Sequence, residues 1–228
     1  MRNQIIKECK EHQDLKYQVF NSSLIPDNNY RMIGVRMPIL HKIAKNIIKS
    51  NPSAFLKEVK DIYYEEVMIE GLVIAQLQTE DKYTLITNYL PKITNWSLCD
   101  SFVLALKDNS EDFFKYVINC TKSNNPYTIR FGIVNMLYYY INDRYLLTIL
   151  KIITKLNTEH YYVKMARAWC MAECYIKYPN ETMPYLLKLN DYWVLNKSIQ
   201  KIKESLRLTK DEKQYVVNET KQILNKLK

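Results

Sequence analysis

The sequence predicts an all-α protein built from stacked helical repeats, and three observations support this fold class. Only 3 glycines and 7 prolines occur among the 228 residues, which leaves few of the turn residues that a strand-rich fold needs. Apolar residues recur at three- and four-residue spacing along most of the chain, as they do on amphipathic helices. Segments with one pattern also return at nearly constant intervals, which indicates a repeat architecture.

Five segments share a pattern in which polar or aromatic residues precede an amphipathic helix. They span 63–77, 95–107, 127–140, 161–175 and 194–205. Aligned on one position, they follow each other at steps of 32, 33, 34 and 33 residues, and the aligned residues are Glu65, Ser97, Arg130, Lys164 and Lys197. Shorter helical patterns lie between the later segments, at 111–123, 144–156 and 183–189.

Two helices per repeat are typical of α-solenoids of the HEAT-like, armadillo or tetratricopeptide kind, whose units stack because none buries its apolar face alone. We expect about five to six helix pairs, curved around a basic concave groove. The whole chain, 1–228, is expected to form one monomeric repeat domain, with its core repeats at 33–205. A helical or irregular entry segment is expected at 1–32 and a C-terminal helix at 206–228, and the stretch 15–34 looks irregular.

The charge of the chain suits a polyanionic partner. The 33 Lys and Arg residues against 24 Asp and Glu residues give a net charge of +9, and each phosphate that such a protein neutralises releases counterions. From the third repeat onward the aligned position is basic, so Arg130, Lys164 and Lys197 are candidate phosphate ligands along one surface. The alternative is that these residues only solvate exposed helix faces, as most lysines do.

Several other classes of protein are disfavoured. The five cysteines form no CxxC pair and no zinc spacing, so we expect no metal site. No Gly-rich phosphate loop occurs. The first residues lack the apolar core of a signal peptide, and no apolar run reaches the length of about 18 residues that a membrane span needs. We therefore expect a protein of the cytoplasm without a membrane partner.

The stretch ITNWSLCDSF at 93–102 carries the clearest chemical pattern. Trp96 and Asp100 lie one helical turn apart on the same face. Asp100 also lies on nearly the same side of its helix as the aligned basic residues of the later repeats. A carboxylate beside a polyanion is costly unless it has a role. It could orient water or stabilise positive charge on a sugar, and the indole face attracts cations. The structural alternative is a packed Trp beside an acid that favours the helix dipole.

Five stretches follow one another in a telling order and spacing: IGVRMPILHKIAK (33–45), YYEEVMIEGLVI (63–74), ITNWSLCDSF (93–102), YTIRFGIVNML (127–137) and YYVKMARAWCMAECY (161–175). In these stretches the chain resembles the HEAT-like-repeat DNA glycosylases of the AlkD family, which remove N-alkylated bases. The resemblance runs from about Ile33 to Ser205. It implies hydrolysis of cationic purines such as 3-methyladenine and 7-methylguanine in double-stranded DNA, without a cofactor and without deep base flipping.

The resemblance also implies roles for individual residues. Asp100 would stabilise the oxocarbenium-like sugar or position the attacking water, Trp96 and Trp169 would contact the damaged nucleotide, and Arg130 would bind a nearby phosphate. Periodicity alone places Trp169 in the core, because it lies five residues past Lys164. Lys164 and Lys197 follow from the repeat phase only.

Two alternatives to the glycosylase remain open. Some relatives with this fold bind DNA or branched DNA without excising a base, and α-solenoids in general often serve as protein-interaction scaffolds. The set of Trp96, Asp100, Arg130 and Trp169 distinguishes the glycosylase from the scaffold. Nothing in the sequence cleanly separates it from the non-catalytic DNA-binding protein. Trp193 has no counterpart in the family's pattern and is expected to pack between repeats.

Overall fold

A computed structural model describes residues 1–227, and within this part all the regular elements are helical apart from one isolated β-bridge between Arg31 and Tyr63. The chain divides into two compact units, which we call the N-terminal unit (Met1–Lys107) and the C-terminal unit (Asp108–Lys228). The described residues confirm the predicted all-α solenoid of helical repeats. Lys228, the last residue of the predicted helix at 206–228, lies outside the described residues.

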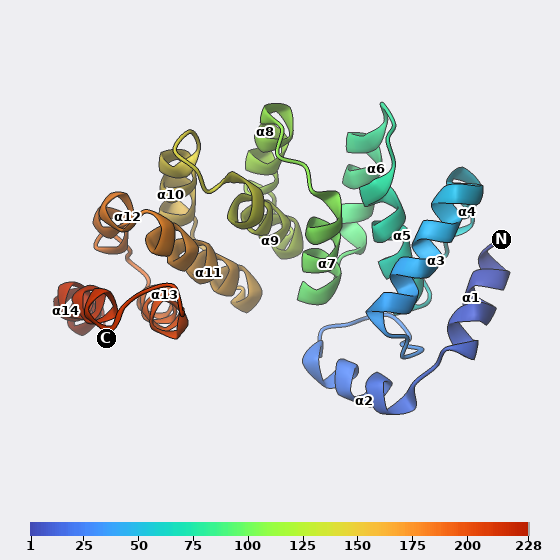
Figure 1. Cartoon of the computed structure of the whole chain (residues 1–228), viewed down its shortest axis with the longest axis horizontal. Coiled ribbons are helices and arrows are strands. Elements are labelled where there is room, and N and C mark those ends of the chain that lie inside the picture. Colours follow the sequence, from blue (N-terminus) through green and yellow to red (C-terminus); the bar gives the residue numbers. More distant parts are fainter. Residues whose placement is uncertain (228) are drawn as a thin grey trace. The chain divides into compact units, whose positions relative to one another are not determined.

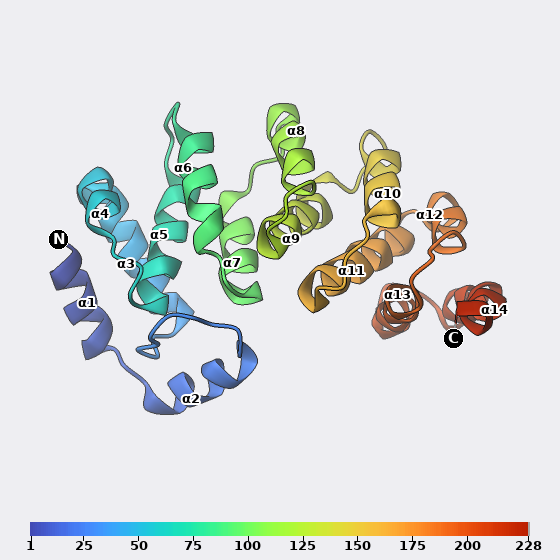
Figure 2. The ribbon, with the colours of Figure 1, turned by 180° about the vertical axis from the view of Figure 1, so that it is seen from behind.

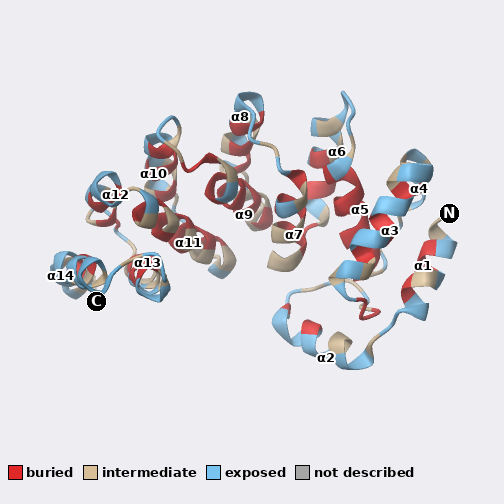
Figure 3. Ribbon diagram, viewed as in Figure 1, coloured by how far each residue is buried: buried red, intermediate tan, exposed pale blue. Residues whose placement is uncertain are grey.

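The N-terminal unit contains seven α-helices and a short 3₁₀-helix. They are α1 (Arg2–Glu11), α2 (Leu15–Leu24), α3 (Met37–Ser50), α4 (Pro52–Glu58), α5 (Tyr64–Gln76), α6 (Lys82–Tyr89), η1 (Leu90–Lys92) and α7 (Trp96–Leu106). Helices α3, α5 and α7 lie side by side in one layer, and α4 and α6 pack against α3 and α5 from a second layer (Figures 1 and 2). Because α5 has neighbours on both sides, it is buried from Tyr64 to Ala75 (Figure 3).

The C-terminal unit repeats the same two-layer arrangement. Its elements are α8 (Glu111–Cys120), α9 (Pro126–Asn135), the π-helical turn η2 (Met136–Tyr140), α10 (Leu146–Lys155), α11 (Tyr161–Lys177), α12 (Pro179–Leu186), α13 (Tyr192–Glu204) and α14 (Lys210–Leu227). Helices α9, α11 and α13 form one layer, with α8, α10 and α12 in the other and α14 packed on α13. The five segments aligned in the sequence thus correspond to α5, α7, α9, α11 and α13.

Short polar side chains determine where several helices begin. An N-cap oxygen accepts a hydrogen bond from a backbone N–H of the first turn, which would otherwise have no partner. Such caps are provided by Asp14 for α2, Asn51 for α4, Asn95 for α7, Ser110 for α8, Asn125 for α9 and Asp191 for α13. Two of these helices, α7 and α13, carry a tryptophan within their first two residues, so the caps also position aromatic rings.

The entry segment is more regular than the sequence suggests. The stretch 15–34 looked irregular, yet Leu15–Leu24 forms α2. Its apolar side chains do not face a core: Val19 is 73% exposed and Phe20 is 59% exposed, whereas the polar Asn21 is buried. The helix therefore lacks the apolar face that usually reveals a helix in a sequence, which explains the difference.

Candidate nucleic-acid interface

Trp96 and Asp100 occupy the first turns of α7 in the N-terminal unit. The buried Asn95 caps this helix by accepting a hydrogen bond from the Leu98 amide at 3.0 Å. Trp96 is half-buried, and its indole N–H donates to the carbonyl oxygen of Leu24, at the end of α2, at 2.9 Å. Asp100 is also half-buried and lies one turn further along α7. The structure therefore places the pair on one partly accessible face, beside α2.

Buried carboxylates of α5 attach the entry segment to the N-terminal unit. Glu65 accepts hydrogen bonds from the backbone amides of Ile33, Gly34 and Val35, at 2.9, 2.7 and 3.2 Å. Glu66 forms an ion pair with Arg2 at the start of α1. The Glu65 bonds hold the loop that follows α2, whose last residue, Leu24, contacts Trp96, and the Glu66 ion pair holds α1.

A third carboxylate of α5, Glu70, shares the Lys92 ammonium with Asp61. The Lys92 nitrogen lies 2.7 Å from Glu70 and 3.1 Å from Asp61. Burial nevertheless raises the pKa of Glu70 to about 7, because the loss of hydration outweighs the attraction of the lysine. The Tyr30 hydroxyl donates to the carbonyl oxygen of Lys92 at 2.6 Å, which ties the entry loop to the same cluster.

Arg130, on α9 of the C-terminal unit, is more deeply buried than we expect for a residue that binds a phosphate. It is only 4% exposed, and its guanidinium donates to the carbonyl oxygen of Tyr162 at 2.8 Å. This bond joins α9 to the first turn of α11. Arg130 therefore connects neighbouring repeats, and its predicted phosphate contact stays a prediction.

The two lysines of the predicted row lie near the first turns of α11 and α13. The Lys164 ammonium is 3.4 Å from Asp191 and 3.5 Å from Glu159, and Asp191 is also 3.2 Å from the buried Arg167. Lys197 is half-buried, and its ammonium donates to Gln200 at 2.7 Å. The three basic residues thus differ in accessibility, which their common repeat phase did not indicate.

Trp169 is half-buried on α11 and lines a cavity of about 390 Å³, rather than lying wholly in the core. The Tyr138 ring meets the indole edge-on at 5.6 Å between centroids. Glu173, one turn after Trp169, lines the same cavity and accepts two hydrogen bonds of 2.7 Å from Arg207. The sequence reasoning missed Glu173, although Trp169 and Glu173 repeat the spacing of Trp96 and Asp100.

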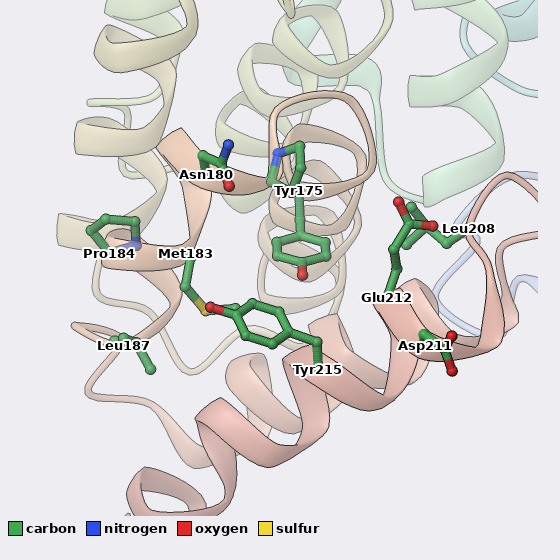
Figure 4. Close-up of a pocket in the computed structure, with 10 residues that line it drawn as sticks. Tyr175, Asn180, Met183, Pro184, Leu187, Leu208, Asp211, Glu212 and Tyr215 are labelled. Atoms are coloured by element: carbon green, nitrogen blue, oxygen red, sulfur yellow. The ribbon is translucent and has the colours of Figure 1, made fainter.

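A larger cavity of about 640 Å³ lies in the C-terminal unit between the end of α11, α12 and the start of α14. Figure 4 shows the Tyr175 and Tyr215 rings lining it with Met183, while Glu212 projects from α14. The Glu212 carboxylate accepts hydrogen bonds from the Thr209 amide and hydroxyl at 2.8 Å, and the Glu212 amide donates to the Thr209 hydroxyl at 3.3 Å, so the two residues cap the start of α14 together. None of the predicted site residues lines this cavity.

The predicted site residues divide between the two units. Trp96 and Asp100 belong to the N-terminal unit, and the other four, Arg130, Lys164, Trp169 and Lys197, belong to the C-terminal unit. Within residues 1–227, no group of three His, Cys, Asp or Glu side chains is arranged to hold a metal ion. No helix of the described chain has the length and apolar character needed to cross a membrane.

Comparison with known proteins identifies the family to which the chain belongs. No curated protein and no solved structure matches the chain. A family model described as DNA alkylation repair enzyme matches residues 5–207, from α1 to the end of α13 and the three residues after it. This match covers well over half of the chain and includes all six predicted site residues. The chain belongs to the family of DNA alkylation repair enzymes.

Proposed function

We propose that this protein is a DNA glycosylase that hydrolyses the N-glycosidic bond of cationic N-alkylated purines, such as 3-methyladenine and 7-methylguanine, in duplex DNA. Family membership supports a role in DNA alkylation repair. The observation that carries the finer proposal is the Trp96–Asp100 pair, which shares a half-buried face of α7. An aromatic surface and a carboxylate at one place suit a reaction in which positive charge develops.

In this mechanism the alkylated base leaves readily because it already carries a formal positive charge. As the bond to the base breaks, charge moves onto the sugar, and the Asp100 carboxylate stabilises it or orients the attacking water. Trp96 contacts the damaged nucleotide beside Asp100, and Trp169 offers a second aromatic surface to the DNA on the C-terminal unit. The half-buried position of both rings suits contact at a surface without a deep pocket for the base.

Phosphate contacts in this proposal come from the basic residues of the C-terminal unit. Lys164 and Lys197 are half-buried, so their ammonium groups support this role better than Arg130, which is 4% exposed. Such contacts would fix the position of the duplex, while the lesion itself is distinguished by its charge.

The test is release of methylated bases from duplex DNA by the wild type and by Asp100→Asn, which keeps the shape of the side chain and removes its charge. We expect the wild type to release 3-methyladenine or 7-methylguanine, and the variant to be slower by about a hundredfold or more, the scale for one electrostatic contact to a transition state. Asp81→Asn, at an exposed position before α6, is the matched control and should keep full activity.

Two outcomes would contradict the proposal. Binding of methylated duplex without release of any base by the wild type would make the protein a non-catalytic DNA-binding member of the fold. Full activity of the Asp100→Asn variant would leave a glycosylase but remove the role assigned to Asp100.

A further inference from the structure

Trp193, which the predicted active site does not use, lies among aromatic and basic side chains of the C-terminal unit. It is the second residue of α13 and is half-buried. The Tyr161 ring, on the first residue of α11, meets the indole at 5.5 Å between centroids and 68° between planes. The Lys164 and Lys197 ammonium groups lie 6.0 and 5.8 Å from the indole centroid.

The aromatic contacts continue beyond Trp193. The Tyr161 ring lies 5.1 Å from that of Tyr162, which in turn lies 6.1 Å from Tyr127 near the start of α9. Aromatic rings therefore connect the first turns of α9, α11 and α13. Core packing alone does not account for this row, because the Tyr161 ring is 53% exposed. The core contacts of α13 are made instead by Val194 and Leu195, which are buried.

The charges around Trp193 favour an anion. Lys197 has no ion pair among the described residues, since its ammonium donates to the neutral Gln200. Asp191 accepts from the Val194 amide and faces both Lys164 and Arg167, so its one negative charge is shared by two cations. The remaining carboxylate, Glu159, is 91% exposed and is therefore well screened by water. The three cations Lys164, Arg167 and Lys197 therefore outnumber the two carboxylates, Asp191 and Glu159.

We propose that Trp193, Lys164 and Lys197 form a binding site for an unpaired nucleotide of a DNA strand, with the base stacked on the indole and the phosphates on the lysines. The inference rests on the DNA-binding part of the proposed function. Stacking on an aromatic ring accepts any base, because every base has a π-face. Both ammonium groups lie at the limit of about 6 Å for a cation–π contact, so little cation–π energy is lost when they turn to phosphates. Lys164 also exchanges its ion pairs with Asp191 and Glu159 for the phosphate.

The experiment compares the affinity of the protein for single-stranded oligothymidylate and for a blunt, unmethylated duplex of equal length. Trp193→Leu keeps an apolar side chain and removes the ring, and we expect it to weaken strand binding about tenfold and duplex binding less than about twofold. Trp193→Phe should keep most of the strand affinity, because it preserves a stacking surface. A thermal melt of each variant establishes that the helices are intact.

The lysines are tested by the salt dependence of strand binding. Lys197→Gln should reduce the slope of log affinity against log salt by about 0.7, the value for one phosphate contact on a single strand. Lys203→Gln, on an exposed position of the same helix, is the matched control and should leave the slope unchanged. Thymidine monophosphate should not displace the strand at equal concentration, since one phosphate engages fewer cations.

Unchanged strand affinity in Trp193→Leu, or equal losses on strand and duplex, would overturn the site. Displacement by thymidine monophosphate would make the ligand a free nucleotide and would overturn its assignment to a strand. Because base release is measured separately on methylated duplex, the loss of this site leaves the glycosylase proposal standing. Absence of any DNA binding by the wild type would contradict both the glycosylase proposal and the strand-binding site.

Discussion

At the scale of single residues, Glu70 gives the protein a specific pH dependence. Its pKa rises from 4.5 to about 7 on folding, chiefly through burial. Between these two values the folded protein holds a proton that the unfolded chain has released, so this residue makes the free energy of unfolding fall as the pH rises. The stabilisation is complete below about pH 4.5 and lost above about pH 7.

Glu70→Gln removes this titration while keeping the size of the side chain. We expect the variant to gain about 2 kcal/mol in unfolding free energy, relative to the wild type, between about pH 5 and about pH 7. Urea denaturation at the two pH values measures this difference. Glu80→Gln, at an exposed position, should follow the wild type. A constant difference between Glu70→Gln and the wild type at both pH values would contradict this account.

The same scale shows which site residues the sequence could reveal. Trp96 and Asp100 share a helix face, and this relation is local, so spacing alone predicts it. The burial of Arg130 depends on the carbonyl oxygen of Tyr162, 32 residues away in the chain, and no local pattern encodes such a contact. Trp169 also needed the family resemblance, because its place beside a cavity depends on Arg207 and on residues of α13.

At the scale of elements, Glu65 holds the entry loop to α5. Removing its carboxylate in Glu65→Ala leaves three backbone amides of residues 33–35 without their acceptor. We expect a loss of about 2–4 kcal/mol in unfolding free energy, since bonds to a charged group are strong and buried amides are costly to leave unpaired. Hydrogen exchange should accelerate first at these three amides.

Glu80→Ala is the control for this change, because Glu80 is exposed and lies in the loop before α6. It should shift neither the stability nor the exchange of residues 33–35. Unchanged exchange at these amides in Glu65→Ala would mean that the carboxylate does not hold the loop.

The elements also show where the sequence signal fails. Apolar spacing correctly predicts α5, α7, α9, α11 and α13, because each of these helices packs against at least one neighbouring helix of the layer in its own unit. It fails at α2, whose Leu15, Val19 and Phe20 face solvent. The predicted start of α12 is also late: the pattern begins at 183, whereas the helix begins at Pro179, since its first turn is polar.

At the scale of the whole molecule, the period of 32–34 residues was the most informative property of the sequence. Within each unit the repeats bury their apolar faces against one another, so the period must be kept even where individual residues vary. The net charge of +9 belongs to the same scale and supports a polyanionic partner. Neither property says which cations are accessible, because exposure depends on contacts between neighbouring repeats.

The five cysteines offer a test of packing throughout the described chain. All are buried and none forms a disulfide, with Cys9 and Cys99 in the N-terminal unit and Cys120, Cys170 and Cys174 in the C-terminal unit. Burial raises the pKa of Cys9 and Cys120 to about 12, which suppresses the reactive thiolate at neutral pH. We therefore expect a thiol reagent to label the native protein only through opening of its structure, and to label all five cysteines rapidly in denaturant. Mass spectrometry of digested samples identifies each labelled cysteine, and rapid labelling of any of them in the native protein would show that the surrounding helices are not packed as described.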